Sequence, residues 1–140
     1  MAQHPRRTVC IAPLVDVLGG LVELGIVRAV LEAPVRAVDA KGNALEYPVV
    51  SVIPKRDAPT DRSHDSIARD LAVDVVVACR TLAEVDQVAN DVEDRIAELG
   101  GWELREVVFG YDAEERPFFY AAHTFARAYV TATANPGGQP

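Results

Sequence analysis

The stretch Leu71-Ala-Val-Asp-Val-Val-Val-Ala-Cys79, together with the pattern that follows it as far as Gly101, decides the fold. Apolar side chains occupy every second position of this stretch, which is typical of a strand with one buried face. Thr81 and Glu84 have the spacing of a capping box, in which each side chain binds the backbone amide of the other residue. The sequence therefore predicts a long strand followed at once by a long helix, which Gly100 and Gly101 end.

The predicted helix is amphipathic, because its apolar residues recur at spacings of three and four. They are Leu82, Val85, Ala89, Val92, Ile96 and Leu99. Its polar side carries several acids against Arg95, namely Glu84, Asp86, Asp91, Glu93, Asp94 and Glu98. We interpret this side as a solvated face with an Asp91–Arg95 ion pair. A surface that repels polyanions or meets a basic partner is the alternative.

Further elements flank this unit. Pro13 suits the first turn of a helix that runs to about Leu24 and ends at Gly25. The pair Gly19-Gly20 weakens this helix or lets another backbone approach it. The segment 26–38 is ambiguous, although Pro34 would confine any strand there to an edge or a strand start. Turns are expected at 39–43 and 111–117. Three more strands are predicted: Val49–Ile53, which Pro54 ends, Glu103–Phe109, and Phe118–Thr131.

The order of these elements predicts an α+β fold. It consists of a mostly antiparallel or mixed sheet of about four to five strands, with two helices packed on one face. The 140 residues are expected to form one domain over residues 1–134, with a loose N-terminus at residues 1–8. Residues 135–140 are expected to be a disordered tail.

The composition argues against several classes of function. The net charge of −7 argues against a protein that binds nucleic-acid backbone, which needs a basic face, and equally against one that binds anionic lipid. Its apolar runs are too short to cross a bilayer, and we expect neither a membrane span nor a signal peptide. Cys10 and Cys79 lie far apart and outside any CxxC pattern. Both are therefore expected to be buried, reduced thiols.

No catalytic, cofactor or metal site is predicted, and we expect a protein that is not an enzyme. The histidines, His4, His64 and His123, each lack a second ligand at metal-binding spacing. The serines lack a nucleophile turn, and no glycine-rich phosphate loop occurs. The aromatic residues Trp102, Phe109, Phe118 and Phe119 are expected in the core rather than around a cofactor.

The segment Lys55–Ser66 is too long for an ordinary connection between strands. We expect it to be a functional arm or a disordered excursion. It carries charges of both signs, which suits docking to another subunit, although solubility alone would also explain them. The candidate interface residues are Arg56, Asp57, Asp61, Arg62, His64, Asp65 and Arg69.

Residues 44–133 resemble the lambda-type phage tail terminator proteins, the minor tail protein U family. The resemblance begins at the strand Tyr47-Pro-Val-Val-Ser-Val-Ile53 and continues through the charged segment Lys55–Ser66 and the alternating strand Leu71–Cys79. It includes the helix opening Leu82–Asp86 and the motif Phe109-Gly-Tyr-Asp112. The last strand adds an Ala-x-x-Thr-Phe-x-x-x-Tyr pattern, from Ala121 to Tyr129.

The resemblance implies a structural protein without catalytic residues. Such a protein forms a hexameric ring on the head-proximal end of the tail tube, stops tube growth and offers the head a joining surface. Its partners would be copies of itself, the major tail tube protein and a head-completion or neck protein. The ring would be assembled in the host cytoplasm and become part of the virion. DNA would pass through it without specific binding, and the acidic balance of the chain suits this passage.

Two other functions stay open from the sequence. A neck, head–tail connector or tail-completion protein of the same virion would share the same general build. A small ligand-binding or enzymatic α+β domain is a different class, in which His123 with Asp74 or Tyr129 would form a polar site on the sheet. A deep pocket in which His123 is hydrogen-bonded to a carboxylate, or an uncovered sheet face, would favour this second class.

Overall fold

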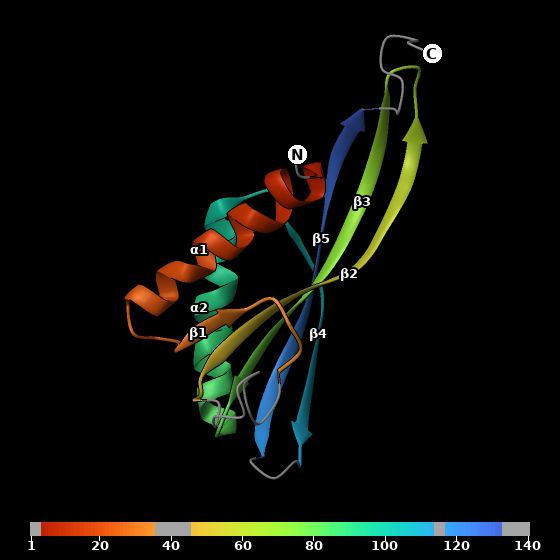
Figure 1. Ribbon diagram of the computed structural model, residues 1–140. Helices are drawn as coiled ribbons and strands as arrows, with labels where there is room; N and C mark the ends of the chain where they lie inside the picture. The colour runs from red at the N-terminus through yellow and green to blue at the C-terminus, as the bar shows by residue number, and fades with distance from the viewer. Residues whose placement is uncertain (1–3, 36–45, 114–116, 133–140) are drawn as a thin grey trace.

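The structure, a computed structural model, describes residues 4–35, 46–113 and 117–132 (Figure 1). The turn predicted at 39–43 and the tail predicted at 135–140 lie outside the described residues, as does the acidic part of the turn predicted at 111–117. Within the described part, Tyr111 and Asp112 belong to a strand rather than to that turn.

The chain forms a five-stranded mixed sheet with its helices on one face, which confirms the predicted α+β fold (Figure 1). The strand order is β1-β2-β3-β5-β4, in which β1 runs parallel to β2 and all other neighbours are antiparallel. The elements in chain order are η1 (Arg6–Ile11), α1 (Ala12–Glu23), β1 (Ala29–Leu31), β2 (Val49–Arg62), β3 (Ser66–Cys79), α2 (Leu82–Leu99), β4 (Glu103–Asp112) and β5 (Phe118–Ala132).

The central strand and helix lie where the sequence predicts them. The Thr81 hydroxyl accepts a hydrogen bond from the Glu84 amide at 3.2 Å and caps α2. The expected reciprocal contact differs, because the Glu84 carboxylate accepts from the Thr81 hydroxyl at 3.1 Å rather than from its amide. Gly100, with φ of 78°, ends α2 as predicted, and Gly25, with φ of 74°, ends α1. Both glycines use a backbone conformation that other residues rarely adopt.

The core lies between the sheet and the two helices. The alternating residues of β3 from Leu71 to Cys79 are fully buried against the apolar stripes of α1 and α2. Cys10 and Cys79 are both buried and free, which confirms the expectation for the thiols. Burial, with the charge of Glu84, raises the pKa of Cys79 to about 12, and burial also raises the pKa of Cys10. Neither thiol has the character of a nucleophile.

The prediction that Lys55–Ser66 connects two strands is wrong, because β2 continues through Pro54 to Arg62 and pairs with β3 along its whole length. The pairing register shifts next to both prolines, between Pro54 and Arg56 and between Pro59 and Asp61. β1 covers β2 only at residues 49–51, so the rest of this strand lies at an edge of the described sheet. Proline has no amide hydrogen to donate. It is tolerated there, because at an edge or a bulge the strand pairing does not need that donor.

The expectation of a loose N-terminus is wrong for residues 5–8, which are helical. Residues 1–3 lie outside the described part. Arg6 donates from Nε to Asp57 Oδ2 at 2.6 Å, and Arg7 binds the Glu32 carboxylate through both terminal nitrogens. These two contacts hold η1 against the sheet, and no pattern in the sequence indicates them.

Three other predictions need correction. Phe109 is 56% exposed on β4, whereas Phe118 is buried and Trp102 and Phe119 are partly buried in the core. The predicted Asp91–Arg95 pair is not among the ion pairs of the described residues. The Arg95 guanidinium instead lies beside Gly20, so this glycine makes room for a side chain rather than for a backbone.

Replacing Gly19 by alanine should stabilise the protein by about 0.5–1 kcal/mol, because nothing lies within 4 Å of the added Cβ and alanine is the better helix former. Gly25→Ala should destabilise it by a similar amount, since its φ is positive. Urea unfolding of the two variants beside the parent chain measures both effects. Equal stability of Gly19→Ala and Gly25→Ala would contradict the assigned ends of α1.

Candidate functional site

A three-stranded arm extends beyond the helix layer (Figure 1). We define the arm as residues 56–70 of the β2–β3 hairpin and residues 128–132 of β5, which pair with β3 up to Ser66 and Ala132. Its strands are continuous with those of the main sheet. The arm is therefore an extension of the sheet rather than a loop attached to it.

At the base of the arm, Asp57 joins three segments of the chain. Its Oδ2 accepts hydrogen bonds from Arg6 Nε and from the Tyr129 hydroxyl, and its Oδ1 lies 3.7 Å from a guanidinium nitrogen of Arg69. Arg69 Nε in turn donates to Thr131 Oγ1 at 3.1 Å. The Asp57 side chain is only 12% exposed. Asp57 and Arg69, both predicted at an interface, thus also take part in an internal cluster that ties η1 to β2, β3 and β5.

The electrostatics of this cluster favour the ionised form of Asp57. Burial alone would raise the pKa of Asp57, but the hydrogen bonds from Tyr129 and Arg6 and the charges of Arg6 and Arg69 outweigh it. The pKa of Asp57 is therefore lowered. The pKa of Tyr129 is raised by burial and by its hydrogen bond to Asp57.

The tip of the arm is the hairpin turn, which is exposed. Four of the predicted interface residues lie at or beside it: Asp61, Arg62, His64 and Asp65. The hydrogen bonds of the two acids stay within the turn. Asp61 Oδ1 accepts from the Arg62 amide at 2.8 Å, and Asp65 Oδ1 accepts from the Ser63 hydroxyl at 3.4 Å. The structure does not bring the seven candidates into one cluster, because Asp57 and Arg69 lie on the helix side at the base and these four lie at the tip.

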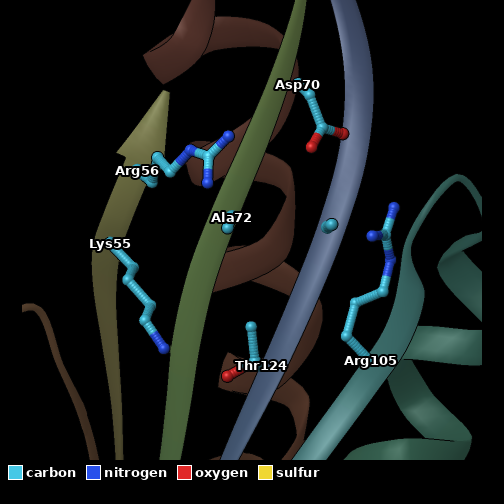
Figure 2. Close-up of a pocket in the computed structure, with 7 residues that line it drawn as sticks. Lys55, Arg56, Asp70, Ala72, Arg105 and Thr124 are labelled. Carbon is cyan, nitrogen blue, oxygen red and sulfur yellow. The ribbon is translucent and has the colours of Figure 1, made fainter. Parts of the chain in front are cut away.

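The remaining candidate, Arg56, lies on the sheet face opposite the helices. It borders an open groove of about 520 Å³ that also involves Lys55, Asp70 and Arg105. Figure 2 shows Arg56 reaching from β2 toward β3, while Arg105 stands on β4 beyond β5. Ala72, Thr124 and Ala126 line the groove between them. No helix of the described chain covers this face, so the sheet has one buried and one open side (Figure 1).

The sequence does not predict that residues of β4 and β5 line a groove together with Arg56. They come together through the strand register: Arg56 pairs with Ala72, Ala72 with Ala126, and Ala126 with Glu103. Lys55 Nζ lies 3.9 Å from Asp74 Oδ1, and Arg105 Nε lies 3.4 Å from Glu103 Oε1. Arg56 has no ion pair with any residue that the structure describes. Of the three cations that line the groove, Arg56 is thus the one without an ion pair among the described residues, and Asp70 is the acid in the lining.

The polar site suggested around His123 does not form as predicted. Asp74 lies on the opposite sheet face, where it accepts a hydrogen bond from Thr124, and Tyr129 binds Asp57 instead. His123 is fully buried, with Nε2 3.2 Å from Glu93 Oε2 and Nδ1 3.1 Å from the Val75 carbonyl. These contacts join β5 to α2 and β3. The His123 side chain is therefore enclosed by its neighbours rather than exposed at a surface site.

No described group of three or more histidine, cysteine or acidic residues could hold a metal ion. Among the helices in the described ranges, none is both long and apolar enough to span a membrane. No protein-family model matches this chain, and no curated protein sequence matches it significantly.

Proposed function

We propose that this protein is a ring-forming structural subunit of the phage tail terminator type. The observation that supports this proposal best is the three-stranded arm, whose charged tip projects beyond the helix layer while the adjoining sheet face stays open. A projecting tip and an open face on one subunit are two different surfaces, which suits a heterologous contact in which one surface meets a different surface of the next copy. Such contacts close into rings when the rotation between copies permits it.

In this proposal the ring, a hexamer, caps the tail tube at its head-proximal end in the virion. Its other contacts are with the major tail tube protein and a head-completion or neck protein, and DNA passes through its lumen. The protein carries out no reaction. The resemblance of residues 44–133 to tail terminators supports this assignment, and a neck or tail-completion role in the same virion is the nearest alternative. Two features expected of a ligand-binding or enzymatic domain are present, namely the uncovered sheet face (Figure 1) and the hydrogen bond between His123 and the Glu93 carboxylate. A site near His123 is nevertheless disfavoured by the complete burial of this side chain.

Sedimentation velocity over a concentration series tests the assembly. We expect a species several times the 15.1 kDa mass of the chain, growing with concentration, and rings in negative-stain electron micrographs. Addition of the protein to polymerising tail tubes should limit their length. A strict monomer at all concentrations that also leaves tube length unchanged would end the proposal.

The double change Arg56→Glu and Arg62→Glu should weaken assembly at least about tenfold, because charge reversal at an interface puts like charges together. Both side chains are exposed, so the circular dichroism spectrum and the thermal midpoint should stay close to those of the parent chain. Arg28→Glu, an exposed reversal beside β1 and away from the arm, is the matched control. Unchanged assembly of the double variant would show that the arm and groove cations make no subunit contact.

A further inference from the structure

The groove and α2 have complementary surfaces on opposite faces of one subunit. We propose that the outward face of α2 from one copy docks in the groove on the open sheet face of the next copy. This inference rests on the proposed function and deepens it, since it names the two surfaces that meet in the ring. The contact would complete a third layer over the uncovered face of the sheet.

The shape of the groove suits a single helix. Its cations stand on β2 and β4, with β3 and β5 between them. Three strand intervals place the two flanking strands about 14 Å apart, and an α-helix with its side chains is about 10–12 Å wide. The floor consists of Ala72, Thr124 and Ala126, whose short side chains allow an approaching helix to come close (Figure 2).

The outward face of α2 suits this floor. Its middle consists of small and uncharged residues, because Ala83, Asn90 and Ala97 are exposed and recur every seven positions. Asp86, Asp94 and Glu98 flank this line and are also exposed. Asp86 and Glu98 are twelve residues apart, about 18 Å along the helix axis. None of these three acids forms an ion pair with another described residue.

The charges of the two surfaces are complementary. Three cations, Lys55, Arg56 and Arg105, and one acid, Asp70, line the groove. The lining thus has an excess of two positive charges, which Asp74 beside Lys55 and Glu103 beside Arg105 offset, so Arg56 is the groove cation that has no ion pair with a described residue. α2 offers unpaired carboxylates, and Arg95, the basic residue of the helix, points toward α1 at Gly20 rather than outward. An acidic helix of a second copy is thus a better occupant than a basic or an apolar one.

A charge-swap experiment tests this contact in the full-length chain. One variant carries Arg56→Glu and Arg105→Glu in the groove, and a second carries Asp86→Lys and Asp94→Lys on α2. Each variant alone should assemble at least about a hundredfold more weakly than the parent, because like charges then face each other. Mixed in equal amounts, they should regain assembly, since each remaining contact pairs opposite charges. Native mass spectrometry should then show rings with equal numbers of the two variants.

The controls separate the possible outcomes. Arg28→Glu and Glu23→Lys, exposed reversals outside both surfaces, should assemble normally. If the parent chain assembles and either swapped variant assembles equally well alone, this contact is wrong while the proposed function stands. If the parent chain is a monomer at all concentrations, the proposed function itself is wrong, and the helix contact fails with it. If a labelled DNA oligonucleotide binds the parent at low salt and not the groove variant, the groove serves a nucleic acid, which would also overturn the helix contact.

Discussion

Asp57→Asn should lower the free energy of unfolding by about 2–3 kcal/mol at neutral pH. Breaking a buried ion pair costs about 3–5 kcal/mol when it leaves the partner charge uncompensated, and less when the partner is partly exposed. The Arg6 side chain is 37% exposed and that of Arg69 is 23% exposed, so water recovers part of the loss. Urea unfolding followed by circular dichroism measures the difference.

Asp61→Asn is the matched control, because it makes the same chemical change at the exposed tip of the arm and should alter stability by less than about 0.5 kcal/mol. Limited proteolysis adds a second readout. Since Asp57 holds η1 through Arg6, its loss should expose residues 5–11 to cleavage before the rest of the chain. If Asp57→Asn is as stable as Asp61→Asn, the cluster at the base of the arm contributes nothing.

The pH dependence of stability should identify the same carboxylate. The pKa of Asp57 lies below its ordinary value of 3.8 in the folded protein. Its contribution to stability is therefore fully present above that ordinary value and is lost as the pH falls toward the folded pKa, because the unfolded chain binds the proton first. The stability difference between the parent and Asp57→Asn should accordingly narrow below about pH 4. A difference that stays constant down to pH 2 would contradict this.

His123→Ala should cost about 3 kcal/mol, although the residue is far from the arm. The substitution leaves a cavity in a fully buried position, and it removes hydrogen bonds that join β5 to α2 and β3. His64→Ala, at the exposed hairpin turn, should change stability by less than about 0.5 kcal/mol. Thermal unfolding of both variants measures the contrast.

Glu93→Gln separates a packing role from a charge role for this histidine. The Glu93 side chain is 39% exposed, and an amide of the same shape can still form a hydrogen bond with Nε2, so we expect a loss of only about 1 kcal/mol. If His123→Ala were instead as stable as the parent but lost the binding of a small molecule, a site near His123 would have to be considered again. Unchanged stability of His123→Ala would also argue against a structural role for His123.

The sequence predicts the parts of the fold in which neighbouring residues decide the outcome. The alternation from Leu71 to Cys79, the Thr81 cap and the glycine stops at Gly25 and Gly100 are all found as expected, because period, capping and positive φ are local properties. A local pattern gives the wrong result at Pro54, which is predicted to end the strand Val49–Ile53 but lies within β2. A proline ends a strand only where its missing donor is needed, and that depends on which edge of the sheet the strand occupies.

The candidate surfaces depend even more on distant residues. The sequence indicates that Arg56 is charged and near a turn, but not that Arg105 lies across two strands from it. Arg6, Asp57 and Tyr129 form one cluster although more than fifty positions separate the first two. Such groupings follow from strand order and register, and a single sequence contains no local pattern for either. His123 is a further case, since its partner Glu93 belongs to a helix whose polar side we expected to be fully solvated.

The continuity of the arm with the main sheet has a consequence for how fast and how tightly it can bind. A loop of this length would have to be ordered on contact with a partner, and the lost conformational entropy would reduce the affinity. Because β3 is hydrogen-bonded on both sides as far as Ser66, the arm is already ordered before any partner is met. Association should then resemble rigid docking, with a rate set by diffusion and orientation rather than by a folding step.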